Sequence, residues 1–187
     1  MQRVAQELGF TKMAVYRYVP GRPELVALMT DRALGLPPKP SKSKNWRKRI
    51  EAWAQAVFDI FTAHPWGLEA TTGQRVMGPN EMAWAEAGLE PLAETGLNGP
   101  DRLDVLAVML GHLRSSAQMV AGIGPSLGLE TQMNLLTTRT LNGREAEFPQ
   151  FSAAIAEASA LKAENNGLSF GINCILDGVE WQMAKRR

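Results

Sequence analysis

The residues best equipped for chemistry lie close to the N-terminus, where cations and aromatic hydroxyl groups recur at helical spacing. Lys12 and Arg17 can donate hydrogen bonds to the O6 and N7 atoms of guanine or to phosphate, and Met13 can contact a thymine methyl group. Tyr16 and Tyr18 can bond to the nucleic-acid backbone through their hydroxyl groups. Together these side chains predict a helix whose N-terminal part enters the major groove of DNA.

Residues 4–19 have the pattern of a helix-turn-helix that would present those side chains. Gly9 supplies the positive φ that ends a first helix and permits a sharp turn. We expect Phe10 to fill the corner of this turn and Thr11 to cap the second helix. The apolar positions expected to face one another across the pair are Val4, Ala5, Leu8, Ala14 and Val15. A plain helical hairpin with exposed basic residues is the alternative.

Charge is divided unevenly along the chain. Residues 1–50 carry eleven Lys and Arg residues against three acidic ones, a net charge of +8. The remaining residues carry nine basic and sixteen acidic ones, a net charge of −7. A basic end joined to an acidic body is typical of a nucleic-acid-binding segment attached to a domain with another task. A solvated charged terminus would explain the same pattern more simply.

Helical signals dominate the rest of the chain, so we expect an all-α fold. Residues 37–44 include three prolines and no large apolar residue, which predicts a linker between an N-terminal domain at 1–36 and a helical domain at 45–187. Apolar residues at helical spacing predict helices over 46–63, 79–95, 100–123, 148–162 and 167–185. The expected end signals are His64-Pro65 after the first helix, Asn80 as a cap of the second, and Pro100-Asp101 at the start of the third.

Two of these helices have informative apolar faces. In the helix at 100–123 one side carries Leu103, Leu106, Leu110, Leu113, Ala117 and Val120. The helix at 167–185 is apolar on two sides, with Leu168, Ile172, Ile175, Leu176, Val179 and Met183 on one and Phe170, Cys174 and Trp181 on the other. Such a helix must be covered on both sides. It is either a central core helix or a helix that also forms a subunit interface, where Gly171 and Gly178 would allow close approach.

The N-terminal motif resembles the tetracycline-repressor (TetR) family. The resemblance rests on Arg3-Val4-Ala5, Leu8-Gly9-Phe10-Thr11, Val15-Tyr16-Arg17-Tyr18-Val19 and Gly21-Arg22-Pro23-Glu24-Leu25. Weaker similarity continues through His64-Pro65-Trp66, Gly78-Pro79-Asn80 and Phe170-Gly171 to Ile175-Leu176-Asp177-Gly178-Val179-Glu180. The similarity therefore extends over nearly the whole chain and is most specific in residues 3–30.

The resemblance implies a ligand-responsive transcriptional regulator, most simply a repressor that a small molecule releases from a palindromic operator. Carried over by position, Lys12, Met13 and Arg17 would contact bases, and Thr11, Tyr16, Tyr18 and Arg22 would contact phosphates. A homodimer would form through the helices at about 100–123 and 167–185. Family members have a further helix before the pair found here, so the resemblance also implies that domain 1–36 lacks its first helix.

The sequence indicates a small-molecule site less clearly than it indicates a DNA-binding segment. The candidates for an apolar ligand pocket are Trp66, Met77, Met82, Trp84, Met109, His112 and Met119. Met and Trp at such spacing are more often core residues, and a histidine in mid-helix is more often a structural residue than a ligand contact. With two histidines and one cysteine, a transition-metal sensor is not expected, and no cofactor is predicted.

Two other function classes compete with the regulator. Gly124-Pro125-Ser126-Leu127-Gly128 matches the G-x-S-x-G motif of hydrolases, but both histidines precede Ser126 and the preceding segment is helical rather than a strand. We therefore expect no enzyme. The second competitor is a dimeric protein that binds a small molecule or a partner and no longer binds DNA, for which the missing first helix is the support.

Cellular location follows from what the sequence lacks. No stretch approaches the ~20 uncharged apolar residues that cross a bilayer, and residues 1–5 have no apolar signal-peptide core. We expect a cytoplasmic protein without membrane contact. Cys174 is the single cysteine, which excludes an intramolecular disulfide.

Overall fold

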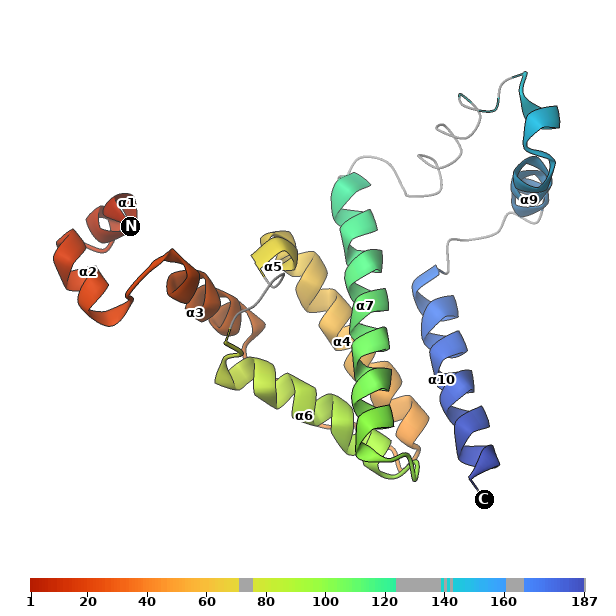
Figure 1. Cartoon of the computed structure of the whole chain (residues 1–187), viewed down its shortest axis with the longest axis horizontal. Helices are drawn as coiled ribbons and strands as arrows, with labels where there is room; N and C mark the ends of the chain where they lie inside the picture. The colour runs from red at the N-terminus through yellow and green to blue at the C-terminus, as the bar shows by residue number, and fades with distance from the viewer. Residues whose placement is uncertain (71–75, 124–138, 140, 142, 161–166, 187) are drawn as a thin grey trace.

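A computed structural model describes residues 1–70, 76–123, 139, 141, 143–160 and 167–186. All regular elements within these ranges are helices, which confirms the all-α prediction. No helix in the described part is long and apolar enough to span a bilayer. The molecule is elongated: the N-terminal helices lie at one end, a bundle forms the middle, and the helix at 149–160 lies at the other end (Figure 1).

The N-terminal pair is a helix-turn-helix in outline. α1 (Gln2–Glu7) and α2 (Lys12–Tyr18) pack on each other across a turn in which Gly9 has φ +70°. Thr11 caps α2 as expected, because its Oγ1 accepts a hydrogen bond from Ala14 N–H at 3.2 Å. Phe10 does not fill the corner: its side chain is 65% exposed. Ala5 is the one fully buried residue among the first twenty, so the small pair offers Phe10 no interior to enter.

α3 (Arg22–Leu34) carries the pair toward the body of the molecule. It packs on α5 (Pro65–Ala70) and α6 (Pro79–Ala93). Gly35 ends α3 with φ +56°, a conformation that costs a glycine little because it has no Cβ. The following residues to Asn45 contain no helix, in agreement with the predicted linker composition.

α4 (Trp46–Ala63) lies at the centre of the body, where it packs on α6 and on α7 (Gly99–Ile123). Its observed bounds match the predicted 46–63. Asn45 caps it by accepting hydrogen bonds from the N–H groups of Arg47 and Lys48, and His64 ends it. Pro65 then begins the short helix α5, which the sequence does not predict, because His64-Pro65 indicates only the end of the preceding helix.

The structure changes the predicted cap of one helix and adds a cap to another. The cap of α6 is Gly78 rather than Asn80, because Pro79 occupies the first helical position and places Asn80 inside the first turn. In α7, Asn98 Oδ1 accepts a hydrogen bond from Asp101 N–H at 2.9 Å and so caps the helix. The Pro100-Asp101 signal for the start of this helix is confirmed.

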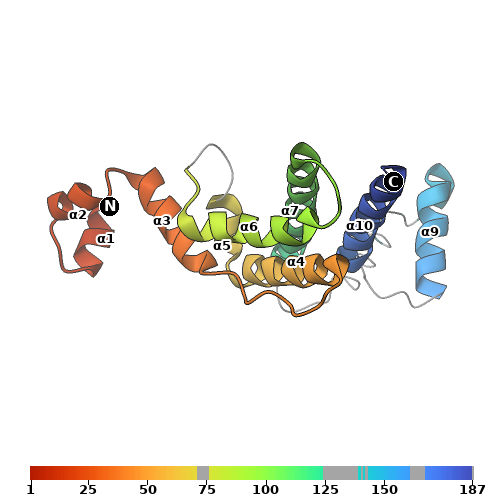
Figure 2. The same ribbon diagram turned by 90° about the horizontal axis from the view of Figure 1, so that it is seen from below.

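The C-terminal part consists of a single 3₁₀ turn (Glu145–Glu147), α9 (Pro149–Ala160) and α10 (Gly167–Lys185). α10 packs along α7 and touches α4, whereas α9 packs mainly on the 3₁₀ turn (Figures 1 and 2). The G-x-S-x-G match at 124–128 lies outside the described residues.

The core is one cluster that α4, α6, α7 and α10 share with α5. Its fully buried members include Ile50, Leu92, Met109, Leu113 and Leu176. On α7 the predicted apolar stripe is only half right: Leu106, Leu113 and Ala117 are buried, but Leu103 and Val120 are 57% and 46% exposed. The buried stripe is rotated toward Met109, because α7 must face α4 and α10 at the same time.

α10 buries one of its two apolar sides. Ile172, Leu176 and Val179 are in the core. Phe170 and Trp181 on the other side are 70% and 56% exposed, and Cys174 is exposed as well. Within this chain, α10 is therefore not a central core helix.

Candidate nucleic-acid interface and ligand cavity

The side chains predicted to read DNA lie on the open side of α2. Lys12 and Arg17 are exposed, and Met13 and Tyr18 are 78% and 82% exposed. Tyr16 is half-buried, and the Lys12 ammonium group lies 5.7 Å from the centre of its ring. Lys12 and Met13 lie in the first turn of α2, the position needed to contact base edges in the major groove, whereas Arg17 lies in the last turn of the helix.

The remaining two predicted DNA contacts have different settings. The Thr11 hydroxyl group accepts the capping hydrogen bond of α2, so it can still donate its own hydrogen to a phosphate oxygen. Arg22 is exposed at the first position of α3. Both lie beside helix N-termini, where backbone N–H groups and the helix dipole favour anions.

A small cavity, called here the central cavity, lies inside the body. It has a volume of about 110 Å³, and α3, α4, α6 and α7 all contribute to its wall. The apolar lining includes Leu34, Phe61, Trp84 and Leu110. The charged groups at its wall are Glu81 and Arg114, and the Arg114 guanidinium donates to the Leu68 carbonyl oxygen at 2.6 Å and lies over the Phe61 ring.

The structure brings together two of the seven predicted pocket residues, since Met77 and Trp84 line the central cavity. Met109 is fully buried in the core instead. His112 joins two helices, because its Nε2 lies 2.9 Å from the Leu168 carbonyl oxygen of α10. The other three predicted residues, Trp66, Met82 and Met119, are 43%, 61% and 48% exposed.

A joint between α3 and α6 adjoins the central cavity. The Asp31 carboxylate on α3 accepts hydrogen bonds from the N–H groups of Asn80 and Glu81 at 2.9 and 3.1 Å, in the first turn of α6. The Asn80 side chain donates back to the Asp31 carbonyl oxygen at 3.0 Å. Gly78 is required for this contact, because a Cβ there would overlap the Asp31 carboxylate.

Two tryptophans connect the end of α3 to the wall of the central cavity through hydrogen bonds. Trp84 Nε1 donates to the Gly35 carbonyl oxygen at 3.0 Å, directly after α3. Trp53 Nε1 donates to the Trp84 carbonyl oxygen at 2.9 Å. Because both indoles also line the central cavity, a ligand there would touch groups bonded to the end of α3.

Sequence reasoning missed Asp31 as a functional candidate, although one signal was available. An acidic residue in the last turn of a helix is unfavourable with respect to the helix dipole. Asp31 has such a position in α3 and therefore needs a partner outside its own helix. The sequence could suggest that the partner of Asp31 is positively charged. It could not show that this partner is the N-terminus of α6.

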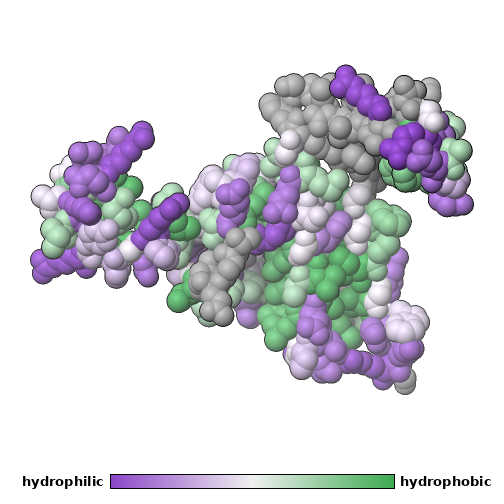
Figure 3. Space-filling model, turned by 45° about the horizontal axis from the view of Figure 1, so that its top comes forward, coloured by the Kyte–Doolittle hydropathy of each residue, from purple (hydrophilic) through white to green (hydrophobic). Residues whose placement is uncertain are grey.

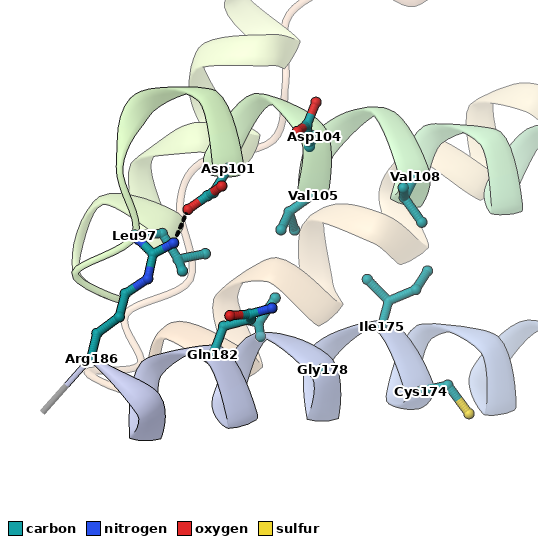
Figure 4. A pocket seen from close by; sticks show the side chains of 11 residues that line it. Leu97, Asp101, Asp104, Val105, Val108, Cys174, Ile175, Gly178, Gln182 and Arg186 are labelled. Carbon is teal, nitrogen blue, oxygen red and sulfur yellow. Dashed lines mark hydrogen bonds and ion pairs between the residues drawn. The ribbon is translucent and has the colours of Figure 1, made fainter.

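A groove between α7 and α10 forms the other notable feature. It has a volume of about 380 Å³ and is lined along its length by Val105, Val108 and Ile175, which point into it from the two helices (Figure 4). An ion pair between Asp101 and Arg186 closes one end. Apolar side chains gather on the same side of the body, in the region of α7 and α10 (Figure 3).

α10 is held in place by one arginine of α4. Arg47 pairs with Asp177 at 2.7 Å and with Glu180 at 3.2 Å, and it also bonds to Asn173 and Glu51. Burial acts to lower the pKa of the Arg47 guanidinium, but hydrogen bonds to Asp177 and Glu180 and their negative charges raise it overall. The arginine therefore stays charged and ties the two helices together. No group of three or more potential metal ligands occurs among the described residues.

Comparison with known proteins places this geometry among bacterial regulators. Residues 38–183 match the family model described as "Tetracyclin repressor-like, C-terminal domain". The HTH-type transcriptional repressor DrrR1 of Streptomyces coeruleorubidus is 29% identical over 198 residues, which cover the whole of this chain and 72% of that protein.

Two solved structures show the fold. The Streptomyces coelicolor TetR family protein ActR in complex with actinorhodin aligns with a TM-score of 0.79 at 20% identity, over 98% of this chain and 87% of that one. A possible TetR family transcriptional regulator from Streptomyces coelicolor A3(2) aligns with a TM-score of 0.71 at 20% identity, over 96% of this chain and 87% of that one.

Proposed function

Because the chain belongs to the tetracycline-repressor family, we propose that it represses transcription from a palindromic operator until a small molecule releases it. We assign DNA reading to residues 1–36, a connecting role to the linker at 37–44, and ligand binding and dimerisation to residues 45–187. The observation that carries this proposal is the joint of Asp31 and Trp84, which connects the helix behind the DNA-reading pair to the wall of the central cavity.

In the DNA-reading step, Lys12, Met13 and Arg17 contact bases, and Thr11, Tyr16, Tyr18 and Arg22 contact phosphates. The support is the exposure of the long side chains on α2 and the excess of five Lys and Arg residues over three acidic residues in 1–36. Phosphate contacts fix the position of the protein and base contacts give the sequence preference.

In the dimer, α7 and α10 of two copies form a four-helix interface. The support is the groove between these helices together with the exposed Phe170 and Trp181. A large exposed apolar surface is unfavourable in water and is typical of a surface that another protein covers. Two-fold symmetry then presents two copies of α2 to the two halves of a palindrome.

In the release step, a ligand enlarges the central cavity and moves its walls. At about 110 Å³ the cavity is smaller than the ~300–1,000 Å³ of usual ligand sites, so occupation must displace side chains. Leu34 of α3 is one of these side chains, and Trp84 is bonded to Gly35 just beyond it. A displacement of α3 changes the separation of the two DNA-reading pairs in the dimer and weakens DNA binding.

The first experiment measures fluorescence anisotropy on an operator selected from random palindromes, across a salt series. We expect the wild type to bind with an affinity that falls steeply with salt, because each neutralised phosphate adds about 0.9 to the logarithmic slope. Double replacement K12Q and R17Q should abolish specific binding, whereas Lys48→Gln, at an exposed lysine of α4, should leave it nearly unchanged.

Actinorhodin, bound by the structural relative ActR, is the first effector to try. Release of the wild type from its operator by actinorhodin would support the full proposal. Binding of actinorhodin without any salt-dependent DNA binding would support instead the DNA-free ligand-binding protein and contradict the repressor.

A further inference from the structure

A second cavity, called here the linker cavity, lies between the linker and helices α4 and α6. Its volume is about 280 Å³. One wall is made by the linker residues Pro37, Pro38 and Pro40, and the other by Ala52 and Trp53 of α4 with Ala87 and Pro91 of α6. Pyrrolidine rings, methyl groups and an indole give it flat apolar walls.

The polar groups of the linker cavity include one cation without a partner among the described residues. Arg49 pairs with Glu94 at 2.6 Å and with Glu90 at 3.7 Å, so its charge is balanced. Lys39, which also lines the cavity, has no ion-pair or hydrogen-bond partner among the described residues. In addition, the Arg49 Nε atom is shielded from solvent and has no hydrogen-bond partner there.

From this combination we propose that the linker cavity is a binding site for a flat aromatic carboxylate. The apolar walls accept the ring system, while Lys39 attracts the carboxylate. The volume lies just below the lower end of the usual range for ligand sites, which favours a ligand of about two fused rings over a larger polycyclic molecule. The ligand bridges the linker to α4 and α6 and so restrains the segment that joins α3 to α4.

This site is distinct from the central cavity. The linings of the two cavities have one residue in common, Trp53, whose indole is held by its bond to the Trp84 carbonyl oxygen. Gly88 keeps the indole in place as well, because a Cβ at Gly88 would lie 2.8 Å from Trp53 ring atoms. The proposal therefore does not depend on which effector occupies the central cavity, or on DNA binding.

Isothermal titration calorimetry with naphthalene-2-carboxylate and its neutral analogue naphthalene-2-methanol tests the site. We expect one carboxylate to bind per chain, about two- to five-fold more tightly than the alcohol, which is the effect of one partly exposed charge pair. Lys39→Gln should remove this preference and leave the affinity for the alcohol unchanged. Lys42→Gln, at an exposed linker lysine outside the lining, should preserve the preference.

Filling the cavity gives the second, independent arm. Ala52→Leu adds a side chain to the linker cavity and should weaken binding of both molecules by about tenfold or more, because the ring system no longer fits. Ala63→Leu makes the same change at an exposed position of α4 outside the lining and should have no effect. Thermal unfolding of both variants checks that they are folded.

Three results would overturn the proposal. The first is the absence of measurable binding to the wild type. The second is unchanged binding in the Ala52→Leu variant. The third is loss of binding in Ala85→Leu, which fills the central cavity, while Ala52→Leu binds normally, because the naphthalene ring would then occupy the central cavity.

Discussion

At the scale of single residues, the joint between α3 and α6 shows how one carboxylate can serve two helices. Asp31 lies where its charge opposes the dipole of α3, but it caps α6, whose N–H groups would otherwise lack partners. Gly78 provides the space and Asn80 completes the contact. A residue that is unfavourable in its own helix is thus favourable in the tertiary structure.

Replacement of Asp31 by alanine should lower the free energy of unfolding by about 1 kcal/mol, the usual effect of a lost N-cap. For a chain of this size, we expect the melting temperature to fall by about 2–4 °C. Differential scanning calorimetry measures the change. Asp59→Ala, at an exposed carboxylate of α4 bonded to Gln55, should shift the melting temperature much less, and an equal shift would contradict the capping role.

Trp84→Phe tests the coupling between ligand binding in the central cavity and release of DNA. The variant keeps an aromatic wall but removes the N–H donor to Gly35. We expect the affinity for actinorhodin to change little, whereas the ratio of DNA affinities with and without actinorhodin should fall by about tenfold. Trp46→Phe is the matched control, because the partly buried Trp46 indole makes no hydrogen bond within the part of the chain that the structure describes. Equal loss of ligand affinity and coupling would mean that Trp84 only shapes the cavity.

At the scale of helices, α7 and α10 each present one buried and one exposed apolar side. Between the two helices lies the groove that Val108 and Ile175 enter from opposite sides. Arg47 fixes α10 against α4, so this surface has a defined shape before any partner arrives. A surface that is rigid before association loses less conformational entropy when it binds.

Val108→Glu should prevent dimerisation, because a charge would be buried in an apolar interface. Sedimentation velocity should show a dimer for the wild type and a monomer for the variant. The control Val76→Glu makes the same change at a valine that is 84% exposed and away from the groove, and it should remain a dimer. A dimeric Val108→Glu protein would place the interface elsewhere.

Arg47→Ala should lower the free energy of unfolding by about 1 kcal/mol, since its partners Asp177 and Glu180 are largely exposed. The pKa of Arg47 is raised in the folded state, so its contribution is complete below the ordinary arginine pKa and is lost only at a still higher pH. The difference in stability between the two proteins should therefore be constant from about pH 6 to 9 in urea unfolding. A difference that disappeared within this interval would contradict the assignment.

At the scale of the whole molecule, the elongated shape separates the DNA-reading pair from the body. The pair α1 and α2 forms one end of an elongated molecule, whereas six of the eleven basic residues of segment 1–50 lie in the linker and the first turn of α4. The α2 surface assigned to DNA thus lies far from the α7–α10 groove assigned to the partner, which limits wrong contacts between DNA and that groove.

Actinorhodin should stabilise the whole body if it occupies the central cavity. At a concentration of 100 times its dissociation constant, the free energy of unfolding should rise by about 2.7 kcal/mol. Differential scanning fluorimetry should show the corresponding rise in melting temperature, and Ala85→Leu, which fills the cavity, should abolish it. A rise that persists in this variant would locate the ligand outside the central cavity.

The sequence by itself determined most of the helices and the exposed face of α2. The helix at 46–63 was predicted to the residue and the one at about 167–185 closely, because helical spacing and end signals such as His64-Pro65 act within a few positions of the chain. Local signals of the same kind predicted that Thr11 caps α2 and that the side chains of Lys12 and Arg17 are exposed.

Only the tertiary structure decided which apolar side chains form a cavity and which form the core. Met109 and Trp84 have similar sequence signals, yet the first is fully buried and the second lines the central cavity and holds the end of α3. Asp31 contacts Asn80, which is 49 positions away in the sequence, and Arg47 contacts Asp177, which is more than 100 positions away. Periodicity specifies the faces of one helix, whereas the partner of each face depends on how all the helices pack together.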